Sequence, residues 1–248
     1  GVQTCALPIL EFGEIELIEN NVLNLPVGNY MALLSHSGSR GMGAAIARHY
    51  SDVARQVCKL PREAQHFAWL GLDTEAGQEY WMSMNLAGDF AQACHERIHI
   101  NLSKALGLKA IANVNNHHNF AWREEIAPDQ YAIVHRKGAT PAGKGVAGLI
   151  PGSMATAGYL VCGKGVQESL NSASHGAGRA MSRQKAKEQF TQSALKKLLS
   201  QNGVTLIGGS VEEMPFAYKD IDRIMPAQES LVEIHGKFMP RIVRMNKE

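Results

Sequence analysis

The stretch VAGLIPGSMATAGYLVCG, residues 146–163, holds two apolar runs on either side of a loop that contains Pro and Gly. The runs at 146–150 and 159–162 are rich in Val, Leu, Ile and Tyr, a composition that favours short strands. Similar runs recur along the chain and end in loops rich in Gly, His, Ser, Asn or Lys; they lie at residues 14–18, 30–34, 110–114 and 131–134. Because a rigid scaffold can aim the loops at its strand ends, this repetition indicates one shared site.

Helical patterns separate several of these runs. In residues 84–106 apolar side chains recur at steps of three and four, which predicts a long helix with one buried stripe. Residues 44–57 and 182–199 also have helical patterns, and we expect a last helix near residues 225–234. Short strands mixed with helices, without a regular βαβ period, predict a mixed α/β fold of the α+β class.

The composition is that of a chain with one large globular core. It has 248 residues, of which 45% are hydrophobic and 19% charged, and its formal net charge is +2. This balance gives no global attraction to nucleic acid, so an RNA-binding surface has to come from local clustering. No apolar run reaches the roughly 20 residues of a membrane span. Four cysteines without paired spacing are typical of reduced thiols, and we expect a soluble protein of the cytoplasm.

Three glycine-containing loops could bring backbone N–H groups close to phosphate oxygens; they lie at residues 38–43, 151–154 and 176–178. The sequence has no GxxxxGK[ST] or GxGxxG nucleotide motif. Five histidines lie in loops of the same kind, and these are His36, His117, His118, His135 and His175. Neutral imidazole can bind Mn²⁺ or Zn²⁺ and can act as a phosphoryl nucleophile. The loops therefore combine phosphate binding with groups that could do chemistry.

Six sequence blocks stand in a fixed order around these loops. They are HSGSRGMG (36–43), HHNFAW (117–122), HRKGATPAG (135–143), PGSMATAGYLVCG (151–163), SHGAGRAMSR (174–183) and AYKDID (217–222). Together they resemble the RtcB family of GTP-dependent RNA ligases, from about residue 10 to the end. The resemblance implies a single-domain fold with a central β-structure surrounded by helices, of which residues 10–248 would be the C-terminal part.

The resemblance also implies an activity. RtcB enzymes use Mn²⁺ and GTP to join an RNA 3′-phosphate or 2′,3′-cyclic phosphate to a 5′-hydroxyl, in RNA repair or tRNA splicing. The histidine of the family's HGAGR motif, matched by His175, attacks the α-phosphate of GTP and forms a histidine–GMP intermediate. GMP then passes to the 3′-phosphate and gives it a good leaving group. The implied partners are RNA ends such as tRNA halves, GTP and the activating protein archease, and the ligase is expected to be a monomer.

Further site residues follow from the same resemblance. His36 and His118 match ligands of a site for two Mn²⁺ ions. Nucleotide contacts are implied for His118, Asn119, Pro151, Gly152, Ser153, Met154, Gly158, His175, Gly176, Ala177, Gly178 and Lys247. Phosphate or RNA contacts are one interpretation of Arg136, Lys137, Arg179 and Arg183, and a solvated surface position is the other.

The chain departs from the family pattern in several places. Ala155 and Gly158 stand where the family has a glycine and a guanine-contacting serine, and Lys247 matches the family's lysine only if the register slips. The Asp-x-x-Cys and Asn-His ligand pairs that the family has before the position of His36 are absent, and residues 1–9 look like a translated sequencing adapter. Two imidazoles would hold Mn²⁺ weakly, so we expect this polypeptide by itself not to ligate RNA. We also expect an absent N-terminal part to leave apolar surface exposed and solubility low.

Two other functions are compatible with these residues. A metal-dependent phosphoesterase would use the histidines to activate water and would not need a nucleophile at His175, so a trapped GMP adduct separates it from a ligase. A non-catalytic paralogue that binds nucleotide or RNA is favoured by Ala155 and Gly158. Such a paralogue would keep its biological activity after the substitution His175→Ala.

Overall fold

The computed structural model of the chain describes residues 9–117 and 119–245. Residues 1–8, most of the expected leader, lie outside this range. The described residues form two compact units. Residues 36–110 make up a helical unit, and residues 9–35 together with those from 111 onward make up a sheet unit. The mixture of strands and helices confirms the predicted mixed α/β class.

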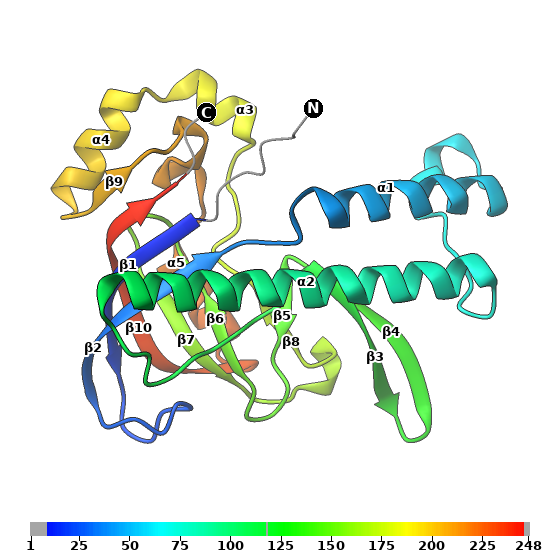
Figure 1. The fold of residues 1–248 in the computed structure, drawn as a ribbon, viewed down its shortest axis with the longest axis horizontal. Coiled ribbons are helices and arrows are strands. Elements are labelled where there is room, and N and C mark those ends of the chain that lie inside the picture. The colour runs from blue at the N-terminus through cyan, green and yellow to red at the C-terminus, as the bar shows by residue number, and fades with distance from the viewer. Residues whose placement is uncertain (1–8, 118, 246–248) are drawn as a thin grey trace. The chain divides into compact units, whose positions relative to one another are not determined.

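A mostly antiparallel sheet is the centre of the sheet unit, with the strand order β2-β1-β10-β7-β6 (Figure 1). The strands are β1 (Ile9–Leu17), β2 (Gly28–His36), β6 (Ala147–Ile150), β7 (Gly158–Gly163) and β10 (Val232–Arg244). The last strand of the chain lies in the middle, because β10 pairs with β1 on one side and with β7 on the other. A short strand, β9 (Thr205–Ile207), pairs with β10 in parallel.

Two smaller strand pairs complete the β-structure of this unit. The strands β3 (Asn119–Ala127) and β4 (Gln130–Lys137) form a hairpin, and β5 (Ala139–Pro141) pairs with β8 (Ser172–Ser174). The helices of the unit are α3 (Arg183–Gln189), α4 (Gln192–Gln201), α5 (Ile221–Ile224) and the 3-10 turns η2 (Gln167–Ser169), η3 (Val211–Glu213), η4 (Pro215–Ala217) and η5 (Pro226–Gln228).

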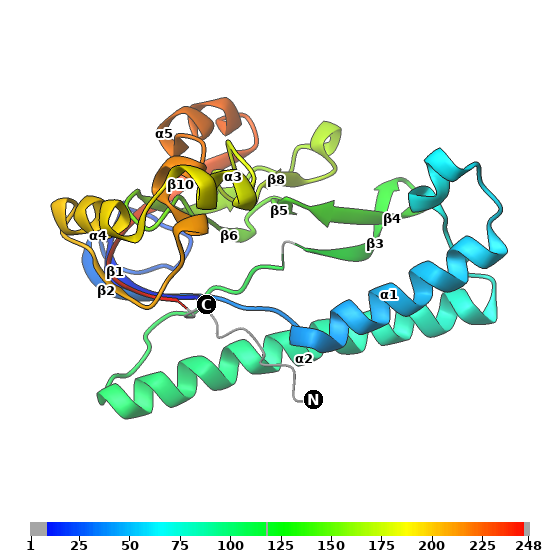
Figure 2. The same cartoon turned by 90° about the horizontal axis from the view of Figure 1, so that it is seen from above.

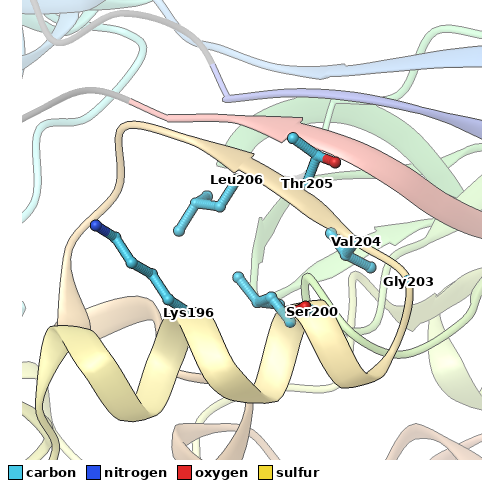
Figure 3. Close-up of a pocket in the computed structure, with 7 residues that line it drawn as sticks. Lys196, Ser200, Gly203, Val204, Thr205 and Leu206 are labelled. Atoms are coloured by element: carbon cyan, nitrogen blue, oxygen red, sulfur yellow. The ribbon is translucent and has the colours of Figure 1, made fainter.

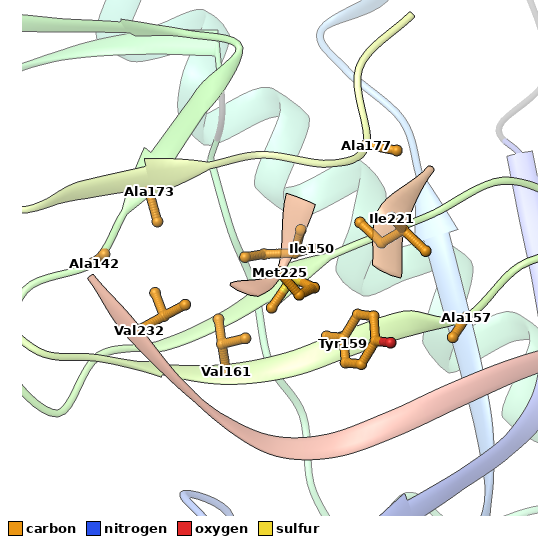
Figure 4. Packing of buried hydrophobic residues seen from close by; sticks show 10 residues of the cluster. All are labelled: Ala142, Ile150, Ala157, Tyr159, Val161, Ala173, Ala177, Ile221, Met225 and Val232. Atoms are coloured by element: carbon orange, nitrogen blue, oxygen red, sulfur yellow. The ribbon is translucent and has the colours of Figure 1, made fainter. Parts of the chain in front are cut away.

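The core of the sheet unit lies between β6, β7 and β10 on one side and the β8 and α5 segments on the other. Ile150, Val161 and Val232 project from the sheet, and Met225 follows α5; all four side chains point toward one another (Figure 4). Burial of each large aliphatic side chain contributes about 1.5–3 kcal/mol to folding. This cluster also contains Ala173 of β8, which ties that short strand to the sheet.

The helical unit is a hairpin of two helices, α1 (Arg40–Val57) and α2 (Glu75–Leu106), which run side by side and are linked through η1 (Arg62–Phe67) (Figures 1 and 2). Thr74 caps the start of α2, since its side-chain oxygen accepts a hydrogen bond from the Gly77 amide, and Gly107 ends the helix in a left-handed conformation. Among the described helices, none is both long and apolar enough to cross a bilayer.

Three predicted elements differ from the structure. Residues 110–114 are irregular, because no neighbouring strand pairs with them among the described residues. The helix expected near 225–234 is wrong, since η5 there gives way to β10 at Val232, where pairing with Gly163 begins. The helix expected at 182–199 is interrupted at Phe190, and Thr191 caps a second helix by accepting a hydrogen bond from the Ala194 amide.

Candidate functional site

His175 is the first residue after β8, and its backbone is fixed by the neighbouring strand. β8 pairs with β5 through Ala139 and Ser174, so the chain leaves the ladder directly at His175. The His175 amide donates a hydrogen bond of 3.4 Å to the Gly138 carbonyl oxygen. Gly138 also lies close to the ring, since a Cβ atom there would be 3.8 Å from the imidazole Cε1. The imidazole therefore stands at the junction of β4, β5 and β8.

Both sides of His175 are anchored in the apolar core. Ala173 and Ala177 are each only 4% exposed and belong to the cluster around Ile150 and Met225 (Figure 4). Between these two alanines, the Ser174 hydroxyl donates a hydrogen bond to the Gly176 carbonyl at 2.7 Å. The position of the imidazole is therefore set by packing on either side rather than by a freely moving loop.

The second glycine-containing loop, residues 151–157, lies against the loop that carries His175. The Ala177 amide donates to the Pro151 carbonyl at 3.0 Å, and a Cβ atom on Gly176 would lie 3.1 Å from the same oxygen. Only glycine allows an approach this close without a shift of the neighbouring backbone. Two loops that are 25 residues apart in the sequence therefore form one continuous backbone surface beside His175.

The loop at 151–157 is shaped by its own side chains. Thr156 accepts a hydrogen bond from the Ser153 amide at 2.7 Å, and the two hydroxyls share another of 2.9 Å. Gly152 is required at the turn, because a Cβ atom there would lie 2.3 Å from the Ala157 carbonyl oxygen. The Met154 side chain is buried in a second core cluster with Leu195. Contact of Met154 with a nucleotide would therefore have to involve its backbone.

The loop after His175 is held by Arg179. Its Nε donates to the Met181 carbonyl at 3.1 Å, one terminal nitrogen donates to the Glu212 carbonyl at 2.6 Å, and the other lies 3.4 Å from the Glu213 carboxylate. The guanidinium also stacks on the Tyr218 ring, with its carbon 5.1 Å from the ring centroid. These contacts occupy most of the donors that a phosphate contact would need, so Arg179 acts here as a brace for the loop.

Tyr218 completes this network. Its hydroxyl donates a hydrogen bond to Glu213, and burial, followed by that hydrogen bond, raises its pKa above the usual value for tyrosine. Tyr218 therefore remains a neutral donor at physiological pH. Its backbone forms a β-bridge with Arg179, and the next residue, Lys219, donates from its amide to the Gly178 carbonyl at 2.9 Å.

The segment before β3 is attached to the same junction. The Asn116 side-chain amide donates to the Thr140 hydroxyl at 2.7 Å, and Thr140 pairs with Ala173 in the β5–β8 ladder. Asn119 begins β3, is exposed and pairs with Lys137, the residue before Gly138. The structure therefore brings the predicted nucleotide contact Asn119 close to the strand end that precedes His175.

Arg136 has a structural role that excludes the phosphate contact considered for it. Its side chain is 2% exposed, and its terminal nitrogens bind the Glu124 carboxylate at 2.6 and 2.8 Å. The remaining donors reach the Ser172 hydroxyl and the Leu170 carbonyl, each at 2.8 Å. Its guanidinium also stacks on Trp122 at 4.8 Å. Arg136 therefore fastens the β3–β4 hairpin to the segment before β8.

The sequence-predicted residues divide into three groups. Those in the sheet unit surround one junction, and they are Asn119, Pro151, Gly152, Ser153, Met154, Gly158, His175, Gly176, Ala177 and Gly178. His36 is exposed; it is the last residue of β2 and the first residue of the helical unit. His118 and Lys247 lie outside the described residues. Within 9–117 and 119–245, no three His, Cys, Asp or Glu side chains come together as metal ligands would.

A separate hollow of about 430 Å³ lies between α4 and β9 (Figure 3). Lys196, Ser200 and Thr205 supply the polar side chains of its walls, beside the apolar Leu206. None of the predicted catalytic or nucleotide-binding residues lines it, and its walls carry no histidine or carboxylate. The hollow therefore contributes nothing to the candidate site.

Sequence reasoning found the glycine loops and His175 but missed the residues that hold them. Tyr218 lies in the block AYKDID, so a signal for it was present. Glu213 and Asn116 had no comparable signal, because each acts on a partner more than 20 residues away in the sequence.

The family model described as "tRNA-splicing ligase RtcB" matches residues 12–246. The chain is 34% identical to the RNA-splicing ligase RtcB of Escherichia coli K12, over 82% of this chain and 53% of that protein. It is 33% identical to the tRNA-splicing ligase RtcB of Nanoarchaeum equitans, over 86% of this chain and 51% of that protein. The chain thus spans about half the length of these relatives.

Proposed function

The chain belongs to the RtcB family of tRNA-splicing ligases, and from this premise we propose that its protein joins RNA 3′-phosphate ends to 5′-hydroxyl ends through GMP linked to His175. The observation that supports the proposal most directly is the position of His175. Its backbone is anchored on both sides in the core and lies against a second glycine loop, an arrangement suited to holding a nucleophile beside a bound phosphate.

In the proposed reaction, an imidazole nitrogen of His175 attacks the α-phosphorus of GTP, and pyrophosphate leaves. The Ser153 and Ala177 amides already donate to Thr156 and Pro151. Other backbone N–H groups of the two loops, such as that of Gly178, whose surroundings are open, would hold the phosphate oxygens. GMP then transfers from His175 to the RNA 3′-phosphate, and the 5′-hydroxyl displaces GMP as the new phosphodiester bond forms. Arg179 and Tyr218 act indirectly, since they hold the loop that carries the nucleophile.

Mn²⁺ is part of the proposal on the strength of family membership. A divalent ion would neutralise phosphate charge that otherwise repels an incoming oxygen. His36 is a described residue that could contribute an imidazole, and His118 would be the second. The described residues by themselves do not form a complete metal site, so we assign no reaction step to the ion.

GMP transfer provides the test. The complete product of the gene would be incubated with Mn²⁺ and GTP labelled at the α-phosphate, beside the variants His175→Ala and His49→Ala. His49 is an exposed histidine of α1 and serves as the matched control. We expect acid-labile label on the wild-type protein and on His49→Ala, and none on His175→Ala.

Label that persists in His175→Ala would contradict the assignment of the nucleophile. RNA 3′-phosphate removal without any protein-bound label would instead support a phosphoesterase. Running the 248-residue chain beside the complete product tests the expectation that this polypeptide alone does not ligate RNA.

A further inference from the structure

The β3–β4 hairpin has one face that is covered and one that is open to solvent. In the antiparallel register, Asn119 pairs with Lys137, Arg123 with Ile133, and Glu125 with Tyr131. Residues opposite each other share a face, so these side chains and His135 lie on the same side of the hairpin. On this face the small Ala121, opposite His135, is buried and Ile133 is half-buried, whereas the larger polar side chains are exposed and Tyr131 is 59% exposed.

The opposite face of the hairpin is fixed to the rest of the sheet unit. Arg136 binds Glu124, Ser172 and the Leu170 carbonyl, as described above. Near the tip, the Gln167 side chain donates to the Ile126 carbonyl. The open face is therefore presented by an anchored hairpin, although two isolated strands are marginally stable in water.

The base of the open face is next to the candidate nucleophile. Lys137 is followed by Gly138, whose carbonyl oxygen accepts a hydrogen bond from the His175 amide. A Cβ atom on Gly138 would lie 3.8 Å from the imidazole Cε1, at van der Waals distance. From Lys137 to Tyr131 the strand spans six residue steps, which is about 20 Å at the usual rise. The face thus begins at His175 and leads away from it.

The chemistry of this face is that of a phosphate backbone contact. Lys137, His135 and Arg123 are consecutive outward positions along the two strands, and all three side chains are exposed. The Arg123 guanidinium carbon lies 5.2 Å from the centroid of the exposed Tyr131 ring, which places a cation beside an aromatic surface. The single carboxylate among them, Glu125, accepts a hydrogen bond from the Asp129 amide in the turn.

We propose that the open face of the β3–β4 hairpin binds the single-stranded RNA whose 3′-phosphate end is presented to His175. The inference rests on the proposed function and adds the surface that guides one of its substrates. Lys137, His135 and Arg123 contact phosphates, and Tyr131 supports a base by stacking. Basic grooves combined with aromatic platforms bind single strands with little sequence preference. The face therefore recognises the backbone of an RNA end and does not read its sequence.

The test measures binding of a fluorescent single-stranded RNA with a 3′-phosphate to the complete gene product over a range of salt concentrations. The variants are Arg123→Gln and Tyr131→Ala, both at exposed positions. Arg223→Gln is the matched control, because that arginine is 88% exposed and lies on α5, outside the hairpin. The GMP-labelling assay on His175 is run on the same proteins.

We expect Arg123→Gln to weaken RNA binding about threefold to tenfold and to reduce the slope of log affinity against log salt by about 0.7, the value for one lost phosphate contact on a single strand. Tyr131→Ala should weaken binding about fivefold or more without changing that slope, since stacking is not ionic. Arg223→Gln should bind RNA as the wild type does.

Unchanged RNA affinity and salt slope in both hairpin variants would overturn the inference, and so would an equal loss in Arg223→Gln. GMP labelling should be normal in all three variants, because none of these residues touches GTP in the proposed reaction. Absence of label in the wild type would count against the proposed function, whereas a loss of RNA affinity confined to the hairpin variants would still support the surface. The two failures can therefore be told apart.

Discussion

At the scale of single residues, Gly158 departs from the family pattern at the proposed nucleotide site. It begins β7, is buried, and a Cβ atom there would lie 3.4 Å from Pro151 Cα, within ordinary contact. A serine at this position would direct a hydroxyl toward the loop at 151–157. The backbone could therefore accommodate the serine that the family has at this position.

We predict that Gly158→Ser raises the affinity for GTP by about threefold to tenfold, because one added hydrogen bond contributes about 1 kcal/mol. The measurement is calorimetric titration with GTP. Gly158→Ala is the matched control, since it adds the Cβ atom without the hydroxyl. Equal affinities of the serine and alanine variants would show that the hydroxyl has no partner on the nucleotide.

Glu11 is a second residue whose environment has a measurable effect. It pairs with Val243, a fully buried member of the second core cluster, so its carboxyl group faces apolar side chains. Burial raises the pKa of Glu11 to about 7. A folded-state pKa above the unfolded value favours the protonated form, so its contribution to stability is present at low pH and is lost as pH rises from about 4.5 to 7.

We predict that Glu11→Gln stabilises the protein at pH 8 by about 2 kcal/mol, because the neutral amide avoids burial of a charge. At pH 4 the variant and the wild type should unfold at similar urea concentrations. Glu16→Gln, at an exposed position of the same strand, is the control and should show no such pH dependence. A constant difference between wild type and Glu11→Gln at both pH values would contradict the prediction.

Much of the candidate site could be predicted at the residue scale, because its chemistry is local. His175 and its glycines are contiguous, and glycine is required where Gly176 approaches Pro151. The contacts of Arg136 and Arg179 could not be predicted, since an arginine that binds phosphate and one that is buried against Glu124 have the same sequence appearance. Only the fold determines which partner is near.

At the scale of elements, the β3–β4 hairpin is attached to the rest of the sheet unit through the side chain of Arg136. Arg136, which is buried, connects β4 to the half-buried Glu124 of β3 and to the segment before β8. Removing one member of a buried charge pair leaves the other uncompensated and is more costly than the loss of an exposed pair.

We predict that Arg136→Met destabilises the sheet unit by about 3 kcal/mol, a value at the low end for buried pairs because Glu124 is partly exposed. Urea unfolding followed by tryptophan fluorescence provides the measurement, since Trp122 stacks on Arg136. Arg123→Gln on the adjacent strand should change stability by less than about 0.5 kcal/mol. If Arg136→Met and Arg123→Gln are equally stable, the contacts of the Arg136 side chain do not contribute to folding.

Elements with a local sequence pattern could be predicted, whereas an element whose conformation depends on pairing with distant strands could not. The helix in residues 84–106 was found because its periodicity is independent of the rest of the fold, although α2 begins earlier, at Glu75. β10 was missed because its alternation is broken between Ile234 and Gly236 and again by Pro240, and its strand conformation depends on β1 and β7. A terminal segment that lies in the centre of a sheet has few signals of its own.

At the scale of the whole molecule, the two units differ in how much they bury. Among the described residues of the helical unit, the buried ones are small: Ala54, Gly77 and Ala87. Met82 and Leu86 are each 63% exposed and lie one turn apart on α2, with Phe90 one turn further along. The sheet unit instead buries two clusters of large side chains. Exposed apolar surface of this kind favours association, and low solubility stays a prediction.

We predict that amides of α1 and α2 exchange with solvent at least about tenfold faster than those of β7 and β10, because local opening of the helical unit exposes little additional apolar surface. Hydrogen-exchange mass spectrometry on the 248-residue chain measures this. Leu86→Gln should increase solubility with little change in the exchange of β7, whereas Leu195→Gln, at a fully buried position, should accelerate exchange in the sheet unit. Equal protection of both units would contradict the prediction.

The burial of Ala173 and Ala177 on either side of His175 has a consequence for how such a protein can change over time. Larger side chains around Ile150 or Met225 would push directly on the two alanines and displace the imidazole between them. A change in the packing around Ile150 and Met225 therefore also changes the position of the His175 side chain. Directed evolution that selects for heat resistance alone should lose the proposed GMP transfer to His175 before it loses the fold.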